Sequence, residues 1–205
     1  MPFGPIIDNN YIRTLPEYQG KPDSALSAAD RGRVAMAKKK DYENEAIERL
    51  KKLKENYGNG VSTLVHVYNA SGDRITLQGE HSWRGSFYGG PPESFIENGQ
   101  WGVFLHVKPT GAAVGSAGAV IYRTAGSADI FVGWQNPWNT MYQPTCHGEA
   151  SSRGWWWDKT TKDHMLSVLD DEATSTFLRS GSGYTVSGKI GDSTTSQYEV
   201  VVEKL

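Results

Sequence analysis

Short segments in which side-chain character alternates with a period of two recur along the chain after residue 60, between turns rich in Gly, Ser, Asn and Asp. In the first segment, Val65 and Val67 alternate with other side chains, as expected when the two faces of a sheet have different surroundings. Residues 70–73, Ala-Ser-Gly-Asp, then predict a hairpin turn. Predicted strands cover residues 63–69, 74–80, 102–107, 117–123, 129–134, 141–147 and 198–204. Many short strands separated by regular turns favour a mainly β fold, an antiparallel β-sandwich.

Two other segments have the periodicity of amphipathic helices. Ser27 and Asp30 form a capping-box sequence before the first, and apolar residues then recur without proline up to Tyr57. The period slips near Lys40, so this stretch predicts either one kinked helix or two short ones. The second helix is predicted over residues 159–173, after the sixth or seventh strand.

The two parts of the chain differ in composition. Residues 1–60 contain no tryptophan, whereas residues 61–205 contain all seven, together with most of the 23 glycines. The first part therefore has few large side chains with which to build a core of its own. We expect residues 1–60 to be a coil and helical extension that packs against, or extends from, a β-sandwich domain of residues 61–205.

Charge and hydropathy exclude several classes of protein. The 205 residues include 21 basic and 23 acidic side chains, a net charge of −2, which argues against nucleic-acid binding driven by counterion release. No apolar run approaches the ~20 residues of a membrane-spanning helix, and no secretory signal is visible at the N-terminus. A single cysteine, Cys146, suits a reducing compartment. We expect a cytoplasmic protein.

Motifs for metal, phosphate or nucleophilic chemistry are missing. The five histidines and Cys146 show no spacing typical of a zinc site, so neither a metal nor a cofactor is predicted. The glycine-rich segment 108–118 lacks the Gly-Lys-Ser/Thr of a phosphate loop and is predicted to be a flexible connection. No G-x-S-x-G sequence occurs, and no catalytic residue is assigned.

Aromatic residues in predicted loops are the strongest functional signal. Trp134, Trp138 and Tyr142 lie in and beside one polar loop, and Trp83 and residues 155–157 lie in two more. Such rings can surround a choline headgroup through cation–π attraction or stack on a sugar. Alternatively, the loops fold back and cover the open ends of the sandwich. Of these rings, Trp138 and Tyr142 are expected to be the most exposed.

Three long blocks resemble a known plant family. PEYQGK at 16–21, LKENYGNGVSTLVHVYNASGD at 53–73 and ENGQWGVFLHVKPTGAAVGSAGAVIYR at 97–123 are similar to the 23 kDa jasmonate-induced proteins. The resemblance covers nearly the whole chain. It implies a stress- or hormone-induced protein in plant defence and supplies no chemistry.

A more remote resemblance links residues 62–142 to the β-sandwich of actinoporins and nakanori-like lipid-binding proteins. It rests on the hairpin YNASGDRIT, on WRGSF at 83–87, on the loop at 111–120, and on the segment that ends in Pro137 and Tyr142. In actinoporins that last segment holds phosphocholine. The resemblance implies an actinoporin-like fold in which Pro137, Trp138 and Tyr142 contact a headgroup, with Ser86 and Gln135 as polar partners. Together with the aromatic signal, it gives these candidate ligand-binding residues: Trp83, Ser86, Trp134, Gln135, Pro137, Trp138, Tyr142 and Trp156.

Three functions from different classes are possible from these observations. The first is a non-catalytic, stress- or jasmonate-responsive binding protein whose aromatic loops engage a lipid headgroup or a carbohydrate, with peripheral membrane contact. Because the charged segment 28–57 replaces the pore-forming helix of actinoporins, pore formation is not expected. The alternative is an enzyme that acts on a small plant metabolite in a Trp-lined pocket, and a storage or protective protein without a specific ligand is a third reading. Acid–base groups available to the enzyme are His81, His106, His147, Asp129 and Glu149. The oligomeric state is left open.

Overall fold

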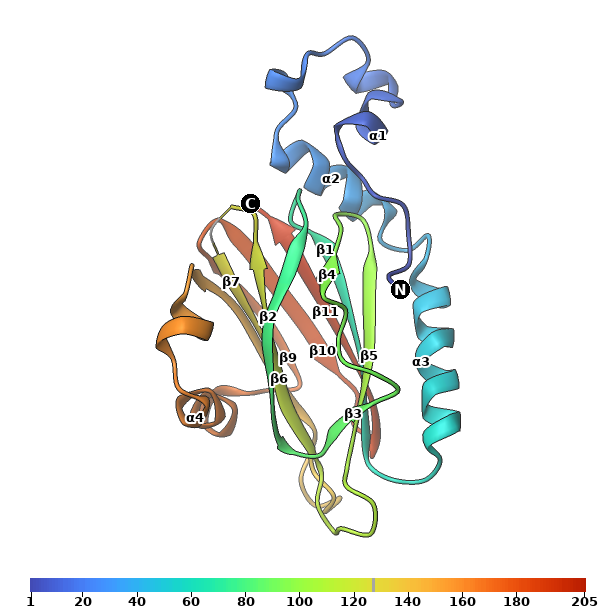
Figure 1. Cartoon of the computed structure of the whole chain (residues 1–205), viewed down its shortest axis with the longest axis vertical. Helices are drawn as coiled ribbons and strands as arrows, with labels where there is room; N and C mark the ends of the chain where they lie inside the picture. The colour runs from blue at the N-terminus through green and yellow to red at the C-terminus, as the bar shows by residue number, and fades with distance from the viewer. Residues whose placement is uncertain (127) are drawn as a thin grey trace.

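Two β-sheets packed face to face form the centre of the molecule in a computed structural model, which describes residues 1–126 and 128–205 (Figure 1). In sheet order, the first sheet contains β3 (Ser86–Tyr88), β5 (Trp101–Val107), β1 (Ser62–Ala70), β11 (Thr195–Lys204), β10 (Tyr184–Ile190) and β9 (Thr176–Gly181). The second contains β4 (Phe95–Ile96), β2 (Ile75–Arg84), β6 (Ser116–Thr124), β7 (Ala128–Asn136) and β8 (Thr145–Ser152). The predicted mainly β sandwich is confirmed.

The strand β1 is apolar on both faces because each face packs in a different core. Val65 and Val67 point into the core between the sheets, whereas Leu64 and Tyr68 join a second core on the outer face of the first sheet. Every residue of β1 is buried, because the N-terminal segment covers that outer face. The alternation in the sequence therefore separates two cores rather than a core from solvent.

One strand pair departs from the predicted antiparallel arrangement. β1 runs antiparallel to β5 but parallel to β11, with Ser62 opposite Thr195 and Ala70 opposite Glu203. Parallel neighbours require a long connection, and here nearly the whole sandwich connects the first long strand to the last. Such a pairing cannot be read from local periodicity.

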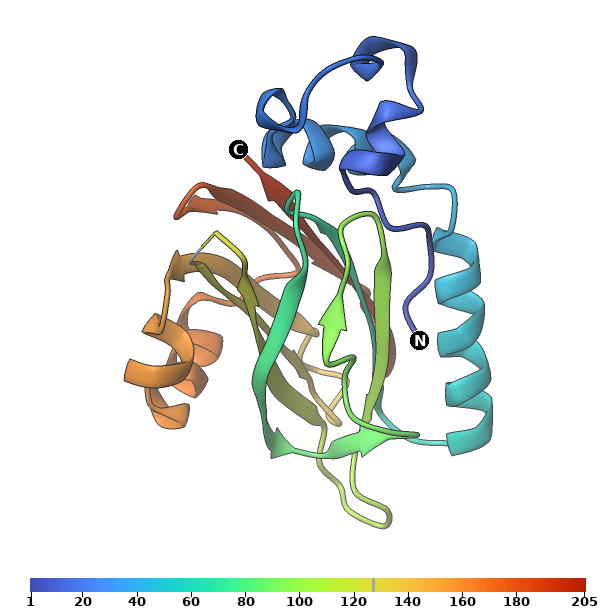
Figure 2. The ribbon, with the colours of Figure 1, turned by 45° about the horizontal axis from the view of Figure 1, so that its top comes forward.

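The N-terminal segment contains α1 (Asn9–Arg13), two short 3₁₀ turns, α2 (Ala28–Lys38) and α3 (Glu43–Tyr57). Ser27 and Asp30 form the expected capping box before α2, with Asp30 N donating to Ser27 Oγ at 3.1 Å. The slip in the apolar period marks the break between α2 and α3, so two helices form rather than one. Figure 2 shows α3 lying along the first sheet while α1 and α2 lie across its end.

The N-terminal segment shares its core with the sandwich. Ile12, Ala46 and Leu50 are fully buried in one apolar cluster with Trp101 and Leu105 of β5. The first 60 residues therefore pack against the β-sandwich through a continuous interior rather than through a surface contact.

The β1–β2 turn docks on the start of α2 and requires glycine. Gly72 has φ +84°, and a Cβ atom there would lie 2.1 Å from the backbone oxygen of Ala28. Arg31 of α2 pairs with Asp73 at 2.7 Å and also donates to the Gly72 oxygen. This turn joins the N-terminal segment to the sandwich.

The outer face of the second sheet carries a π-helix (Trp155–Lys159) and α4 (Lys162–Glu172). The helix α4 follows eight strands rather than six or seven, because β3 and β4 are too short to show an alternating pattern. The helix α4 begins at Lys162, after the N-cap residue Thr161, which is three residues later than predicted. None of the helices in the described ranges combines the length and the apolar character needed to span a bilayer.

The strand predicted at residues 141–147 begins only at Thr145. Pro144 precedes it and Pro137 follows the end of β7, and proline cannot donate a hydrogen bond to a strand ladder. The residues between these two prolines form a loop instead.

Candidate functional site

The β7–β8 loop (residues 137–144) exposes three large side chains at one end of the sandwich. Trp138 is 52% exposed, Met141 is 86% exposed and Tyr142 is 68% exposed. The loop lies at the lower end of the molecule in Figure 1, opposite α1 and α2. Exposing this much apolar surface on one loop is unfavourable in water, which marks the loop as a candidate interaction surface.

Buried contacts fix the base of the loop. Asn136, the last residue of β7, is buried and donates from Nδ2 to the oxygen of Ser62 at 3.0 Å. A Cβ atom on Gly115 would lie 2.1 Å from the Asn136 oxygen, so the β5–β6 loop packs directly against this point. Within the loop, Asn139 Oδ1 accepts from Met141 N at 3.0 Å. The exposed side chains thus extend from a fixed backbone.

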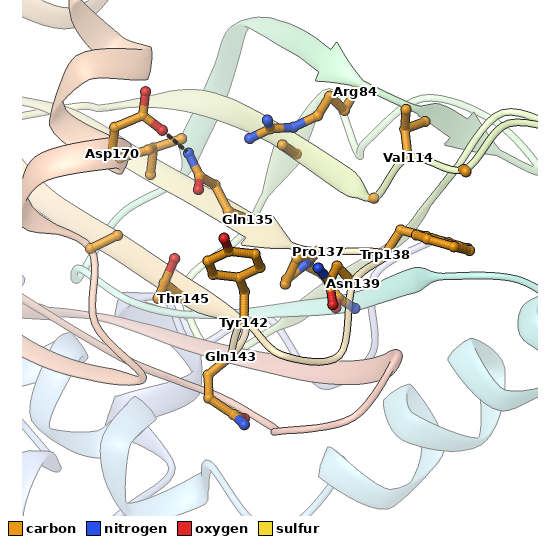
Figure 3. A pocket seen from close by; sticks show the side chains of 16 residues that line it. Arg84, Val114, Gln135, Pro137, Trp138, Asn139, Tyr142, Gln143, Thr145 and Asp170 are labelled. Carbon is orange, nitrogen blue, oxygen red and sulfur yellow. Dashed lines mark hydrogen bonds between the residues drawn. The ribbon is translucent and has the colours of Figure 1, made fainter.

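A pocket of about 640 Å³ lies between this loop, the β5–β6 loop, the start of β6 and the end of α4. Gln135 crosses its floor and donates from Nε2 to Asp170 Oδ1 at 2.7 Å. Figure 3 shows the guanidinium group of Arg84 on the opposite wall, extended toward Gln135 and Asp170. Arg84 makes no ion pair among the described residues. The pocket therefore offers a free guanidinium and a carboxylate within one concave site.

The two exposed rings do not face each other. In Figure 3 the hydroxyl of Tyr142 points toward Gln135, while the indole of Trp138 extends away on the other side of the loop, below Val114. The loop therefore does not form an aromatic cage from these two rings. Tyr142 faces the pocket, and Trp138 forms part of the rim.

Two lysines flank the other side of Trp138. Trp138, Lys54 and Lys108 line a smaller pocket of about 340 Å³. Lys54 Nζ donates to the oxygens of Gly58 and Gly60, and Lys108 Nζ donates to the oxygen of Ala112 at 2.8 Å. Neither ammonium pairs with a carboxylate in the described ranges, and burial lowers the pKa of Lys54. Positive charge thus borders the aromatic loop.

Of the eight candidate ligand-binding residues, four line the larger pocket: Gln135, Pro137, Trp138 and Tyr142. Two others are corrected by the structure, because Trp134 is fully buried and Trp156 is 2% exposed. Trp134 points between the sheets from β7, and Trp156 stacks on Phe131 at 4.4 Å under the π-helix. Neither ring can meet a ligand at the surface.

Trp83 and Ser86 are not among the residues that line this pocket. Trp83 is half-buried and packs against the cluster between the second sheet and α4, 6.1 Å from the ring of His81. Ser86 is exposed on β3, opposite Val107 of β5. They do not join the four residues that the loop brings together.

The acid–base groups proposed for an enzyme are dispersed, and none of the five lines the 640 Å³ pocket. Asp129 is fully buried against Arg123 at 2.7 Å. His147 is buried 3.5 Å from Glu149, and His81 stacks on Trp157. The pocket therefore contains no pair of proton-transfer groups from this set.

His106 is fully buried and belongs to a hydrogen-bonded network that extends to the exposed Ser82. Its Nδ1 lies 2.8 Å from Ser116 Oγ and its Nε2 lies 3.0 Å from Ser82 Oγ. Ser116 Oγ also accepts from Trp134 Nε1 at 3.2 Å. Burial lowers the pKa of His106 to about 3, so its imidazole is neutral in the folded protein at ordinary pH.

We expect this histidine to weaken folding in acid. The unfolded chain takes up a proton on His106 near pH 6.5, whereas the native protein takes it up only near pH 3, so stability falls as pH decreases through this window. The loss attributable to His106 at pH 4.5 is up to about 2–3 kcal/mol. Denaturant unfolding of the wild type and His106→Gln at pH 7.5 and 4.5 measures it. Equal pH dependence in both proteins contradicts the assignment.

Several site residues escaped prediction from the sequence. Met141 was placed inside a strand, and Arg84 and Asp170 reach the pocket from β2 and from α4. Lys54 and Lys108 are likewise separated in sequence and meet only beside Trp138. The one usable signal was Pro144, which excludes Met141 from a regular strand.

Comparison with known proteins agrees with this architecture. The crystal structure of the lipid-binding protein Nakanori superposes with a TM-score of 0.94 and 41% identity, over 100% of both chains. The 23 kDa jasmonate-induced protein of Hordeum vulgare is 38% identical over 160 residues, which are 74% of this chain and 73% of that protein. The resemblances to the 23 kDa jasmonate-induced proteins and to nakanori-like proteins are confirmed. A family model described as "Nakanori-like protein" matches residues 3–205, and the chain therefore belongs to the Nakanori-like family.

Proposed function

We propose that this protein is a non-catalytic binding protein that docks on membranes through the β7–β8 loop and holds a phospholipid headgroup in the adjacent pocket. The observation that carries the proposal is the combined exposure of Trp138, Met141 and Tyr142 on one loop with a fixed base. A lipid-binding protein of the same family, 41% identical over the full length, supports it.

The exposed side chains suit a membrane interface. Moving a Trp or Met side chain from water into an apolar region contributes roughly 1.5–3 kcal/mol. Trp and Tyr rings also favour the zone between headgroups and acyl chains, because one part of each ring system is apolar and the other can donate a hydrogen bond. Trp138 lies at the rim, where its ring can enter this zone.

The charged groups suit a phosphate-containing headgroup better than a neutral sugar. Lys54 and Lys108 flank Trp138, where an ammonium group can donate hydrogen bonds to the phosphate of a headgroup. In the pocket, the free Arg84 guanidinium matches a phosphate and the Asp170 carboxylate matches an ammonium group. A zwitterionic headgroup such as phosphocholine carries both charges.

The N-terminal segment favours peripheral binding without pore formation. Its helices share a buried core with β5, and Ile12 and Leu50 are fully buried. Releasing them into a bilayer would expose this core. We propose that the protein binds at the membrane surface from the cytoplasm, in a stress- or jasmonate-responsive context. The name of its Hordeum vulgare relative, a jasmonate-induced protein, supports the response to jasmonate.

Flotation with vesicles of phosphatidylcholine, and of sphingomyelin with cholesterol, tests the proposal. We expect the wild type to float with at least one composition, and Trp138→Ala to lower the association constant for the vesicles about tenfold, since each 1.4 kcal/mol of lost transfer energy is a factor of ten in that constant. Trp155→Ala is the matched control, because Trp155 is 44% exposed on the π-helix instead. Loss of binding in both variants, or no wild-type binding to any vesicle, contradicts the proposal. Retention on a glycan array without vesicle binding supports carbohydrate recognition instead.

A further inference from the structure

Three potential metal ligands converge where α3 meets the outer face of the first sheet. They are Glu43, the first residue of α3, His66 in the middle of β1, and Glu199 of β11. One ligand atom from each lies within 4.8 Å of the other two. His66 and Glu199 are direct neighbours in the parallel pair of β1 and β11. This cluster does not involve the β7–β8 loop.

His66 supplies the observation that points to a ligand. The residue is 2% exposed, and its Nδ1 is fully buried with no hydrogen-bond partner in the described part of the chain. Leaving a buried polar atom unpaired is costly, and such atoms are rare in folded proteins. The His66 ring packs 5.3 Å from Trp101, which restricts its orientation.

Each carboxylate is at present neutralised by a lysine. Lys39 Nζ contacts Glu199, and Lys40 Nζ contacts Glu43 at 2.8 Å. The Lys40 side chain is 78% exposed and that of Glu43 is 11% exposed, so the lysine reaches in from solvent. The cluster thus already attracts cations. The Lys39 side chain is only 18% exposed and its Nζ lies 5.7 Å from the centroid of the Trp101 ring, so an incoming ion has to displace it.

We propose that Glu43, His66 and Glu199 bind a divalent transition-metal ion of the Zn²⁺ class, which displaces the ammonium of Lys39. One imidazole nitrogen with two carboxylate oxygens is a donor set that Zn²⁺ and its first-row neighbours accept, whereas Ca²⁺ and Mg²⁺ prefer oxygen ligands alone. Since the ligands come from α3, β1 and β11, the ion would join the N-terminal segment to the sandwich. The three ligands are far apart in the sequence, so no local spacing of ligand residues indicates a metal site, and none was predicted.

Titration of the metal-free full chain with Co²⁺, followed by visible absorption, tests this site. We expect one ion to bind per chain with the d–d bands of a low-coordinate site, and Zn²⁺ to displace it and raise the thermal midpoint. Glu199→Gln and His66→Leu should each weaken binding at least tenfold. Lys39→Met should strengthen it, because the competing ammonium is removed.

Matched controls keep the test specific. Glu203→Gln changes a second glutamate on β11, and His164→Gln removes an exposed histidine of α4. Both should bind like the wild type. The proposal is overturned if the wild type shows no 1:1 binding, if Glu199→Gln binds as tightly as the wild type, or if Ca²⁺ competes equally well with Co²⁺. Circular dichroism of each variant checks that the fold persists, and Lys39→Met retains all three ligands.

Discussion

Replacing Trp134 with alanine is expected to lower the free energy of unfolding by about 3–5 kcal/mol, the range found for large-to-small changes of aromatic residues in a core. Trp134 is fully buried between the sheets and packs against Phe104 at 5.7 Å. Its ring lies over Gly118, where an added Cβ would come within 2.7 Å of the indole. The change also removes the hydrogen bond from Nε1 to Ser116.

Trp138→Ala is the matched control, four positions along the chain. Because Trp138 is 52% exposed, its removal should change stability by no more than about 0.5 kcal/mol. Far-UV circular dichroism should follow the unfolding, since each variant loses an indole fluorophore. Similar destabilisation by both variants would show that the Trp138 ring packs inside the sandwich, and would also remove the basis for membrane docking by the loop.

Asp129→Ala is expected to cost about 3–5 kcal/mol, as when one partner of a buried ion pair is removed. The Asp129 carboxylate has no exposed surface and accepts from Arg123 Nε at 2.7 Å and from Arg123 Nη2 at 3.2 Å. Its removal leaves the guanidinium, only 13% exposed, without its main partner. The hydrogen bond from Trp157 N to Asp129 is lost as well.

Asp158→Asn tests how much of the effect of Asp129→Ala depends on the burial of the Asp129 carboxylate. Asp158 contacts the same Arg123 at 3.1 Å, but its side chain is 56% exposed, so the variant should lose no more than about 1 kcal/mol. Urea unfolding of both variants at one pH gives the comparison. Equal losses would mean that solvent screens both pairs alike. The permanent pairing of Asp129 with Arg123 also makes it unsuited to the acid–base role considered for an enzyme.

The sequence was sufficient to predict those elements whose structure depends on contacts between residues close together in the chain. The Ser27 capping box and the apolar period of α2 and α3 involve contacts within one or two helical turns. The tight turn at Gly72 was equally local, because a turn of positive φ favours that residue type. The predicted hairpin was wrong, because β1 and β2 enter different sheets and do not pair with each other. The short strands β3 and β4 were missed, because three or two residues cannot display a period.

The candidate site was predicted only in part. The proline-bounded, aromatic character of residues 137–144 is visible in the sequence, and it led to Pro137, Trp138 and Tyr142. Arg84, Asp170 and the two lysines come from distant segments, so no spacing could reveal them. The same holds for the cluster of Glu43, His66 and Glu199, whose members meet only because β1 pairs with β11.

By itself the sequence determined a β-sandwich with a helical N-terminal segment, because hydrophobic period, caps and turn residues are properties of contiguous residues. The tertiary structure decided which aromatic rings are buried. Trp134 lies on β7, whose alternation directs it into the core, whereas Trp138 follows Pro137, where the strand and its alternation end. The two indole rings have the same chemistry but different exposure. Their exposure depends on whether each side chain points toward strands that are distant in the sequence, and only the packed structure sets that direction.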